Sequence, residues 1–494
     1  MKEFFAMTAT ELSAAIKKKE ISPVEVMEST IARIQRRNPS LNAIVYTDFD
    51  YAMDRARELE KAIMSGQQMG DLCGIPTALK DFLPGKKGWP GTSGGVKCLA
   101  GTPDPVNSTY TKAVEGQHGI VIGKTNSPTF AFRGLCDNYL YGPTGNPFDI
   151  TRNSGGSSGG AAAAVADGLL PIAEGTDGGG SIRIPAAWCG IYGFKASIGT
   201  IPSPARPNAW AETHPYCFAG VLSRTVEDTA LVLNHMAYYD PRDINSLPQP
   251  KRDFREIIKR PIKGMKIAYT PNFGVFSVDP EIEALTRAAA MRFAEAGAVV
   301  EEIDFRFNYT ENELADCWLE QVMLNFLDVL EGMKAGGMDL IKDHADDLPP
   351  QIIAQVEKAR RGDYLTYAAT DNIRTHVFDV MLDAFEKYDL ILAPTVSCEP
   401  VKNASDGNTM GPETINGNRV DRLIGFCPTF FSNMIGTPAA SVPAGLTKNG
   451  LPVGLQIVGR RFCDEDVLRA SAAFQQIQPW AHFYEIVERR PLEK

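Results

Sequence analysis

Two glycine-rich loops that each present a serine constrain the fold of this chain more than any other feature of its sequence. The first loop, residues 154–160, reads Ser-Gly-Gly-Ser-Ser-Gly-Gly, and the second, residues 175–183, reads Gly-Thr-Asp-Gly-Gly-Gly-Ser-Ile-Arg. Glycine allows positive φ values and close approach of the backbone to a ligand, at an entropic cost that ordinary packing does not justify. The two loops therefore predict a site built from backbone N–H groups, with serine hydroxyls as the reactive atoms.

Short apolar segments alternate with helical patterns along the rest of the chain. Ser22, followed by Pro23 and Glu25, forms a capping-box pattern that predicts a helix down to about Asn38. We expect three further helices and three buried strands: residues 161–166, 279–296 and 312–333, and residues 119–124, 390–394 and 455–459. Strands that alternate with helices favour an α/β sandwich.

The composition restricts the partners of the protein. Its 494 residues carry a formal net charge of −10, which argues against binding to nucleic acid or to an anionic membrane. Nine cysteines without a C-x-x-C pair, and six histidines without metal-ligand spacing, predict reduced thiols and no metal site. No segment approaches the ~18 consecutive apolar residues of a membrane span, and the N-terminus has too short an apolar run for a signal peptide. We expect a cytoplasmic protein that needs no cofactor.

Lys80 is the candidate base for chemistry at these serines. A serine hydroxyl is a weak nucleophile that needs a positioned base, and a lysine serves as that base only when it is neutral. Its pKa must then fall well below about 10.4, which burial among the apolar residues before Lys80 would favour and Asp81 would oppose. A shift of about three units costs the fold roughly 4 kcal/mol, which a structure retains only for function.

Other interpretations of these residues stay open. Flexible linkers and phosphate-binding loops are also rich in glycine, although neither a Walker nor a dinucleotide-binding pattern occurs. Residues 155–159 match the nucleophile elbow G-x-S-x-G around Ser157, but an elbow needs an apolar strand before it and 149–153 is a poor strand. A Ser-His-Asp triad could assemble from distant residues, and a surface position is the ordinary alternative for Lys80.

Several segments together resemble the amidase signature family. They span most of the chain, with the weakest resemblance between about 240 and 390: residues 74–81, 123–128, 142–147, 155–160, 175–185, 189–195, 433–439 and 451–456. The resemblance implies an α/β three-layer sandwich, in which helices cover both faces of a large mixed β-sheet. It divides one amidase domain into an N-terminal helical region (1–70), a catalytic core (71–240), a variable, mainly helical cap that governs substrate choice (241–389), and C-terminal elements that complete the core (390–494).

The Ser-Ser-Lys triad of that family maps onto this sequence without gaps. By this resemblance, Ser181 is the nucleophile that forms the acyl-enzyme, Ser157 is the bridging serine that relays protons, and Lys80 is the terminal base. The oxyanion hole, where one donor contributes roughly 3 kcal/mol, would use the backbone N–H groups of Gly178, Gly179, Gly180 and Ser181. Asp177 and Arg183 flank this loop and are expected to hold its shape.

Other positions are implied near the substrate. Ala131 aligns with a pocket-lining position of relatives, and residues 91–93 belong to a segment that relatives use near the substrate. Gly178 stands where the family usually has a larger residue, which loosens the loop or makes room beside the acyl carbon. Candidates to shape the pocket, each of which could equally be core, are Trp188, Trp210, Tyr216, Phe218, Cys317 and Trp318.

The resemblance implies an amidohydrolase that cleaves the C–N bond of carboxylic amides. Residues 424–431 are apolar and aromatic, whereas the A subunit of the glutamine-dependent aminoacyl-tRNA amidotransferase has an acidic residue in the corresponding region. We therefore expect a small alkyl or aryl amide as substrate, and the same triad would serve carbamates and esters. The alternatives are a non-catalytic anion-binding relative and the amidotransferase A subunit itself. We expect a monomer or a homodimer.

Overall fold

The structure, a computed structural model, describes residues 4–206, 208–210 and 216–492. Local sequence chemistry explains where several helices begin. The predicted helix after Ser22 is confirmed as α2 (Pro23–Leu41): the Ser22 side chain accepts from the Val24 N–H, and Glu25 accepts from the Ser22 N–H. Thr310 caps α10 (Glu311–Ala335) in the same manner.

The remaining helices range from one turn to six turns in length. They are α1 (Ala9–Lys17), α3 (Phe49–Met64), α4 (Thr109–Gly116), α5 (Gly159–Ala166), α6 (Arg183–Cys189), α7 (Val226–Met236), α8 (Phe254–Ile257), α9 (Pro280–Met291), α11 (Leu340–Asp343), α12 (Pro350–Arg361), α13 (Tyr364–Phe385), α14 (Phe430–Met434), α15 (Asp464–Ile477) and α16 (Phe483–Glu488). The described residues also form short 3₁₀ turns: η1 (Lys97–Leu99), η2 (Thr129–Ala131), η3 (Arg292–Ala296) and η4 (Ala345–Asp347).

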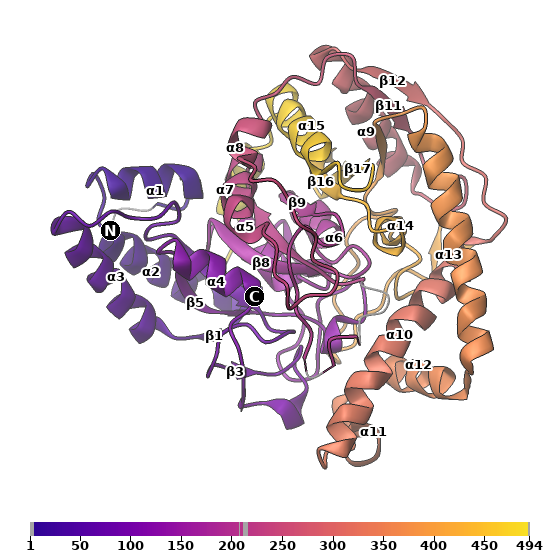
Figure 1. Cartoon of the computed structure of the whole chain (residues 1–494), viewed down its shortest axis with the longest axis horizontal. Helices are drawn as coiled ribbons and strands as arrows, with labels where there is room; N and C mark the ends of the chain where they lie inside the picture. The colour runs from indigo at the N-terminus through magenta and orange to yellow at the C-terminus, as the bar shows by residue number, and fades with distance from the viewer. Residues whose placement is uncertain (1–3, 207, 211–215, 493–494) are drawn as a thin grey trace.

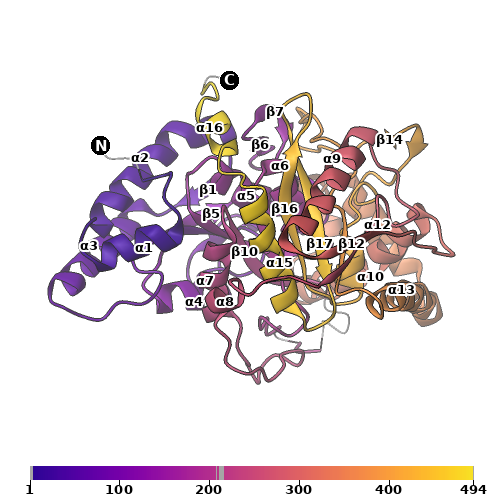
Figure 2. The same cartoon turned by 90° about the horizontal axis from the view of Figure 1, so that it is seen from above.

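A mixed eight-stranded sheet forms the centre of the molecule. Its order is β12 (Val299–Glu302), β11 (Lys266–Tyr269), β13 (Leu390–Pro394), β17 (Pro452–Gly459), β16 (Ala439–Leu446), β9 (Tyr192–Lys195), β10 (Phe218–Ser223) and β8 (Ile172–Asp177). β11 is parallel to both β12 and β13, and the other neighbours are antiparallel. Helices α9 and α15 pack on one face and α5 and α6 on the other (Figures 1 and 2). The predicted three-layer α/β fold is confirmed.

A second sheet of three strands lies beside β8. Its order is β1 (Ile44–Thr47), β5 (Ile120–Thr125) and β2 (Pro76–Lys80), and β2 ends at Lys80. Side chains join β2 to β8, because the Thr77 hydroxyl donates to the Ile172 carbonyl and the Lys80 N–H donates to Glu174. The candidate base therefore lies where the two sheets meet.

Residues 241–389 supply strands as well as helices. β11 and β12 extend the main sheet, whereas α12 and α13 each pack on α10 at its side (Figure 1). None of the helices in the described part of the chain is long and apolar enough to span a membrane.

In the described part of the chain, three two-stranded ladders lie outside these sheets. They are β3 (Pro90–Gly91) with β4 (Thr102–Pro103), β6 (Gly145–Asn146) with β7 (Asp149–Asn153), and β14 (Thr414–Ile415) with β15 (Asn418–Arg419). Residues 149–153, a poor strand by sequence, do form a strand, but its backbone pairs in a local hairpin. It is not a strand of the main sheet that leads into Ser157, so the described backbone around this serine lacks the geometry of a nucleophile elbow.

Buried charge fastens the N-terminal helices to the core. The Asp167 carboxylate, at the C-terminus of α5, accepts from Arg37 Nε at 2.7 Å and Nη2 at 3.0 Å, and from Arg490 Nη2 at 2.9 Å. The Asp167 side chain is fully buried and that of Arg37 is 3% exposed. Such a pair is costly to break, because the remaining partner becomes an uncompensated buried charge.

Asp167→Ala is expected to lower the free energy of unfolding by about 3–5 kcal/mol, because it leaves two arginines without their buried anion. Urea denaturation followed by circular dichroism measures this loss. Asp54→Ala is the matched control, since its 2.9 Å pair with Arg57 is exposed and should contribute less than about 1 kcal/mol. Equal effects of the two substitutions would show that the buried pair does not fasten the N-terminal helices.

Candidate active site

Lys80 and Ser157 form a buried hydrogen-bonded pair. Lys80 lies at the end of β2, and Ser157 lies in the first glycine-rich loop, two residues before α5, after a cis peptide bond to Gly156. Lys80 Nζ donates to Ser157 Oγ at 2.7 Å, and each residue is 1% exposed. The second partner of the ammonium is Thr176 Oγ1 on β8, at 2.8 Å. Lys80 and Ser157 are 77 positions apart in the sequence, yet the fold places them as a base and the hydroxyl that would give it a proton.

Burial shifts the proton affinity of Lys80 in the direction that its proposed role requires. Desolvation lowers the pKa of Lys80 from 10.5 to about 8. The Asp81 carboxylate, which the sequence suggested would oppose this shift, accepts instead from the Thr92 N–H at 3.0 Å, and burial raises its pKa. A lysine with a pKa of about 8 is partly neutral near neutral pH.

Two residues of β8 complete the surroundings of Lys80 and were not predicted as site residues. Glu174 and Thr176 alternate along the strand and so face the same side, toward β2. Glu174 Oε2 accepts from the Lys80 backbone N–H at 3.1 Å, and burial raises the pKa of Glu174 to about 7. Their spacing in the sequence predicts that Glu174 and Thr176 lie on one face of the strand. That this face lies opposite Lys80 is seen only from the contact between β8 and β2.

The second glycine-rich loop is shaped by a fully buried ion pair. Arg183 Nε and Nη2 both donate to Asp177 at 2.9 Å, and neither side chain is exposed. Burial alone would raise the pKa of Asp177, but the Arg183 charge overcomes this and lowers it to about 2. Asn433 adds two 2.9 Å hydrogen bonds, from Nδ2 to the Asp177 carbonyl and carboxylate. The expected structural role of Asp177 and Arg183 agrees with these contacts.

Ser181 lies at the turn between that loop and α6, and 8% of its surface is exposed. The Ser158 N–H donates to the Ser181 carbonyl at 3.1 Å, which joins the two serine loops directly. The Gly180 N–H was expected in an oxyanion hole, but it donates to Asp177 Oδ1 at 2.7 Å. Within the described residues, the N–H groups of Gly178, Gly179 and Ser181 donate to no protein acceptor. Gly180 therefore shapes the loop, and the other three amides are the candidate donors.

Residues from distant segments close around the same loop. Trp318 of α10 donates from Nε1 to the Gly178 carbonyl at 3.0 Å, and Thr429 Oγ1 donates to the Gly179 carbonyl at 2.6 Å. A Cβ placed on Gly179 would lie 2.5 Å from the Trp318 ring, and one on Gly180 would lie 2.0 Å from Thr429 Oγ1. The glycines thus allow the indole and the threonine to contact the loop backbone.

The other candidate pocket residues differ in their surroundings. Trp188 stacks on Phe426 in the core, and Phe218 lies against the buried Lys195. Cys317 and Tyr216 are buried against α13. Trp210, in contrast, is 68% exposed. Among these candidates, the Trp318 side chain donates a hydrogen bond to the second serine loop, through its contact with Gly178.

Ala131 is half-buried at the end of η2, with φ of 55°. The residue before it, Phe130, packs on Phe326 of α10 with ring centroids 4.6 Å apart and donates its N–H to the Ser93 carbonyl at 2.8 Å. The 91–93 segment, the Ala131 turn and α10 are therefore neighbours. The Ala131 N–H donates to the Pro128 carbonyl at 2.8 Å, within its own turn.

Two further lysines are buried near the core, and their partners differ from those of Lys80. Lys124 Nζ forms a 2.7 Å ion pair with Asp104. Lys195 Nζ donates to the carbonyls of Thr437 and Ala196 and lies 3.9 Å from the centre of the Phe218 ring. Burial lowers the pKa of Lys195 to about 7. Neither amine contacts a serine hydroxyl in the described structure, so Lys80 is the lysine placed to exchange a proton with one.

Comparison with known proteins identifies the family. A family model described as Amidase matches residues 25–468. A curated acylamidase of Rhodococcus erythropolis is 35% identical over 479 residues, which cover 96% of each chain. The crystal structure of a bacterial aryl acylamidase of the amidase signature family has a TM-score of 0.96 at 45% identity, with 98% of this chain and 99% of that chain covered. The A subunit of the glutamyl-tRNA(Gln) amidotransferase of Moorella thermoacetica is 33% identical, with 96% of this chain and 97% of that chain covered.

These similarities, together with the fold, define a hydrolase that cleaves amides. The chain belongs to the amidase signature family, as the sequence motifs predicted.

Gly180→Ala is expected to destabilise the protein strongly, because Gly180 has φ of 126° and its new Cβ would overlap Thr429 Oγ1. We expect a loss of about 3 kcal/mol or more in the free energy of unfolding. Gly178→Ala is the matched control: outside its chain neighbours, no atom of the described residues lies within 4 Å of its Cβ position, so its stability should change by less than about 0.5 kcal/mol. Thermal and urea unfolding of both variants measure the difference, and equal stabilities would contradict the described packing of the loop.

Proposed function

We propose that the protein is an acylamidase that hydrolyses small alkyl or aryl amides through an acyl-enzyme on Ser181. Ser157 relays protons and Lys80 is the terminal base. The observation that carries this proposal is the 2.7 Å hydrogen bond between Lys80 Nζ and Ser157 Oγ in a buried site, joined by backbone to the loop of Ser181. A lysine with a lowered pKa that contacts a serine hydroxyl is what nucleophilic catalysis without histidine requires.

In the first step, Ser181 Oγ attacks the carbonyl carbon of the amide. Its proton passes to Ser157 Oγ, and the Ser157 proton passes to neutral Lys80 Nζ. The negative charge that develops on the carbonyl oxygen is stabilised by the amides of Gly178, Gly179 and Ser181, which have no protein acceptor among the described residues. This assignment rests on the Gly180 amide being held by Asp177.

The tetrahedral intermediate then breaks the C–N bond. The departing nitrogen takes a proton from Ser157, which is replaced from the Lys80 ammonium, and the acyl group remains as an ester on Ser181. In the second half, a water gives its proton along the same path and attacks the ester carbon. The carboxylic acid leaves, and the Ser181 hydroxyl and neutral Lys80 are restored.

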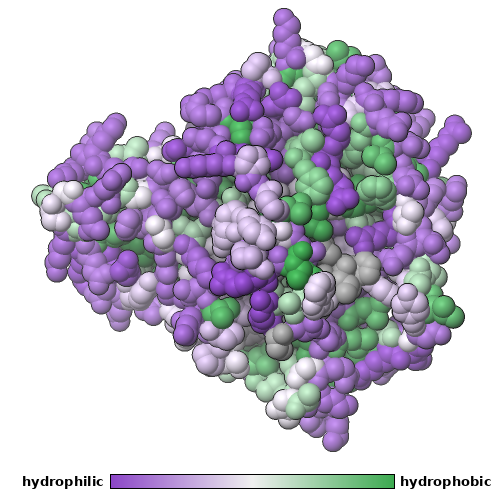
Figure 3. Space-filling view, in the orientation of Figure 1, coloured by the Kyte–Doolittle hydropathy of each residue, from purple (hydrophilic) through white to green (hydrophobic). Residues whose placement is uncertain are grey.

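Apolar surroundings support an apolar substrate. Trp318, which contacts the serine loop, lies in an aromatic group with Phe430 and Phe431 of α14, and these two phenylalanines are no more than 1% exposed. Among the described residues, no atom beyond its chain neighbours lies within 4 Å of the Cβ position of Gly178. Figure 3 shows hydrophobic side chains near the middle of the face seen in Figure 1. The curated acylamidase and the aryl acylamidase structure point to the same substrate class.

An amidotransferase A subunit is the second candidate, because such a protein is 33% identical over nearly the whole chain. The apolar 424–431 segment favours the acylamidase: Phe426, Cys427 and Phe430 in it are fully buried. Hydrolysis of free glutamine that exceeds hydrolysis of an anilide would favour the amidotransferase. If the protein cleaves none of an anilide, an alkyl amide, a carbamate, an ester and glutamine, it would be the non-catalytic relative. The cytoplasmic location and the monomeric or homodimeric state stay predictions from the sequence.

Ser181→Ala and Lys80→Met are expected to lower kcat for a 4-nitroanilide by about 10³-fold or more, because each removes a member of the reacting chain. Ser157→Ala should lower kcat by about 10²–10⁴-fold through loss of the proton relay. Release of nitroaniline, measured by absorbance, gives these rates. Ser154→Ala is the control from the same glycine-rich loop and should leave kcat within about twofold. Normal turnover by Ser157→Ala would remove Ser157 from the mechanism.

The pH dependence of kcat/KM should report Lys80 as a base that must lose its proton. Because burial lowers the pKa of Lys80 to about 8, kcat/KM should rise about tenfold per pH unit below pH 8 and level off above it. Glu174→Gln removes an anion that stabilises the Lys80 ammonium, so the midpoint of the profile should move to lower pH. A profile that stays flat down to pH 5 would contradict the role of Lys80.

A further inference from the structure

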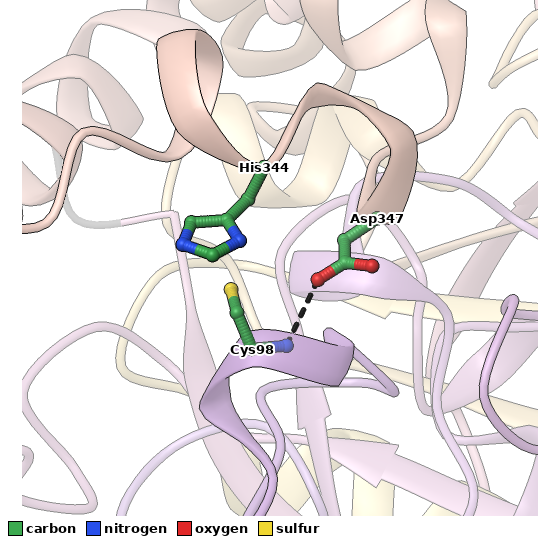
Figure 4. A group of neighbouring side chains, drawn as sticks. All are labelled: Cys98, His344 and Asp347. Atoms are coloured by element: carbon green, nitrogen blue, oxygen red, sulfur yellow. Dashed lines mark hydrogen bonds between the residues drawn. The ribbon is translucent and has the colours of Figure 1, made fainter.

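Three side chains of different metal-ligating types meet where residues 241–389 contact the core. Cys98 lies in η1, and His344 and Asp347 lie at η4, between α11 and α12. The Cys98 sulfur, a His344 ring nitrogen and an Asp347 carboxylate oxygen all lie within 4.8 Å of one another. Figure 4 shows the sulfur next to the imidazole, with the carboxylate beside them. Because 249 positions separate Cys98 from Asp347, their spacing in the sequence does not indicate a metal site.

The geometry and the ligand types suit zinc. Tetrahedral Zn²⁺ with one thiolate, one imidazole and one carboxylate needs about 3.5 Å between ligand atoms, so these side chains must close by little more than about 1 Å. A thiolate in the set favours Zn²⁺ or a similar thiophilic ion over Mg²⁺ and Ca²⁺. All three residues are partly exposed, so an ion can reach them from solvent.

We propose that Cys98, His344 and Asp347 bind one Zn²⁺ that fastens the 241–389 segment to the core. On binding, the Cys98 S–H bond breaks, a sulfur–zinc bond forms, and the proton leaves to solvent. Three protein ligands leave a fourth position for water.

The ion would hold the predicted cap, residues 241–389, in place against the core. Cys98 follows the segment in which the Thr92 N–H donates to Asp81, the neighbour of Lys80. The Ser93 carbonyl in that segment accepts from Phe130, which packs on α10. A cross-link from Cys98 to η4 would therefore hold the cap against a loop near the Lys80 strand. No step of amide hydrolysis passes through the ion, so the zinc site and the acylamidase stand or fall separately.

The full chain, freed of metal with a chelator, is titrated with Zn²⁺ by calorimetry and with Co²⁺ by absorption spectroscopy. We expect one equivalent of each ion, a thiolate-to-cobalt charge-transfer band, and a thermal midpoint that Zn²⁺ raises by several degrees. Cys98→Ser should abolish the band and weaken Zn²⁺ binding at least tenfold. Cys463→Ser, which changes a partly exposed cysteine at the start of α15, is the control and should behave as the unaltered protein.

Asp347→Asn separates metal binding from an ordinary contact between segments. The Cys98 N–H donates to Asp347 Oδ2 at 2.9 Å, and an asparagine oxygen can still accept this hydrogen bond. The variant should therefore fold with an unchanged midpoint in the absence of metal and bind Zn²⁺ at least tenfold more weakly. Each of three results would overturn the proposal. The unaltered protein fails to bind one equivalent of Zn²⁺, the cobalt band survives Cys98→Ser, or Asp347→Asn binds Zn²⁺ as tightly as the unaltered protein does.

Discussion

The buried ion pair between Asp177 and Arg183 fixes the geometry of the candidate active site. Both charges are fully buried, which is costly unless every lone pair and proton is satisfied. Asp177 also accepts from the Gly180 N–H and from Asn433, while Arg183 Nη1 donates to the Thr429 carbonyl. The pair thereby joins the end of β8, the start of α6 and the segment before α14, and it gives the loop of Ser181 a single shape.

Burial of Lys80 adds a second electrostatic cost to folding. Since one pKa unit corresponds to about 1.4 kcal/mol, lowering the pKa from 10.5 to about 8 opposes folding by roughly 3 kcal/mol while the amine is protonated. The sign is that of a lowered lysine pKa: the cost is present below about pH 8 and disappears as pH rises toward 10.5. The Ser157 and Thr176 hydroxyls offset part of it as acceptors. A fold that keeps such a lysine in place, with two hydroxyls as the described hydrogen-bond partners of its amine, fits a base better than a structural cation.

Helices and strands that depend on residues adjacent in the sequence could be predicted from the sequence. The cap at Ser22 defined the start of α2, and the apolar run 390–394 coincides with β13. Contacts between distant segments could not be predicted in this way. Trp318 and Gly178 are 140 positions apart, and Lys80 and Thr176 are 96 positions apart. Composition identified Trp318 only as one of six candidates, because any of the six aromatic or sulfur-containing residues could equally have packed in the core.

The same distinction applies to the serine loops. Glycine content and the family resemblance indicated which amides to consider, but they could not show that the Gly180 N–H is held by Asp177. Periodicity also gave no sign that 149–153 would pair as a hairpin strand, because that strand is stabilised by local backbone pairing and lacks the apolar face that a pattern detects.

Covalent trapping of the nucleophile is the sharpest test of the proposed triad. The full chain is treated with a fluorophosphonate, and the intact mass and the modified peptide are determined at several pH values. We predict one adduct, on Ser181, which forms faster as pH rises through about 8 and much more slowly in Lys80→Met. An adduct on Ser157 or on another residue, or labelling of Ser181 at an unchanged rate without Lys80, would contradict the assignment of nucleophile and base.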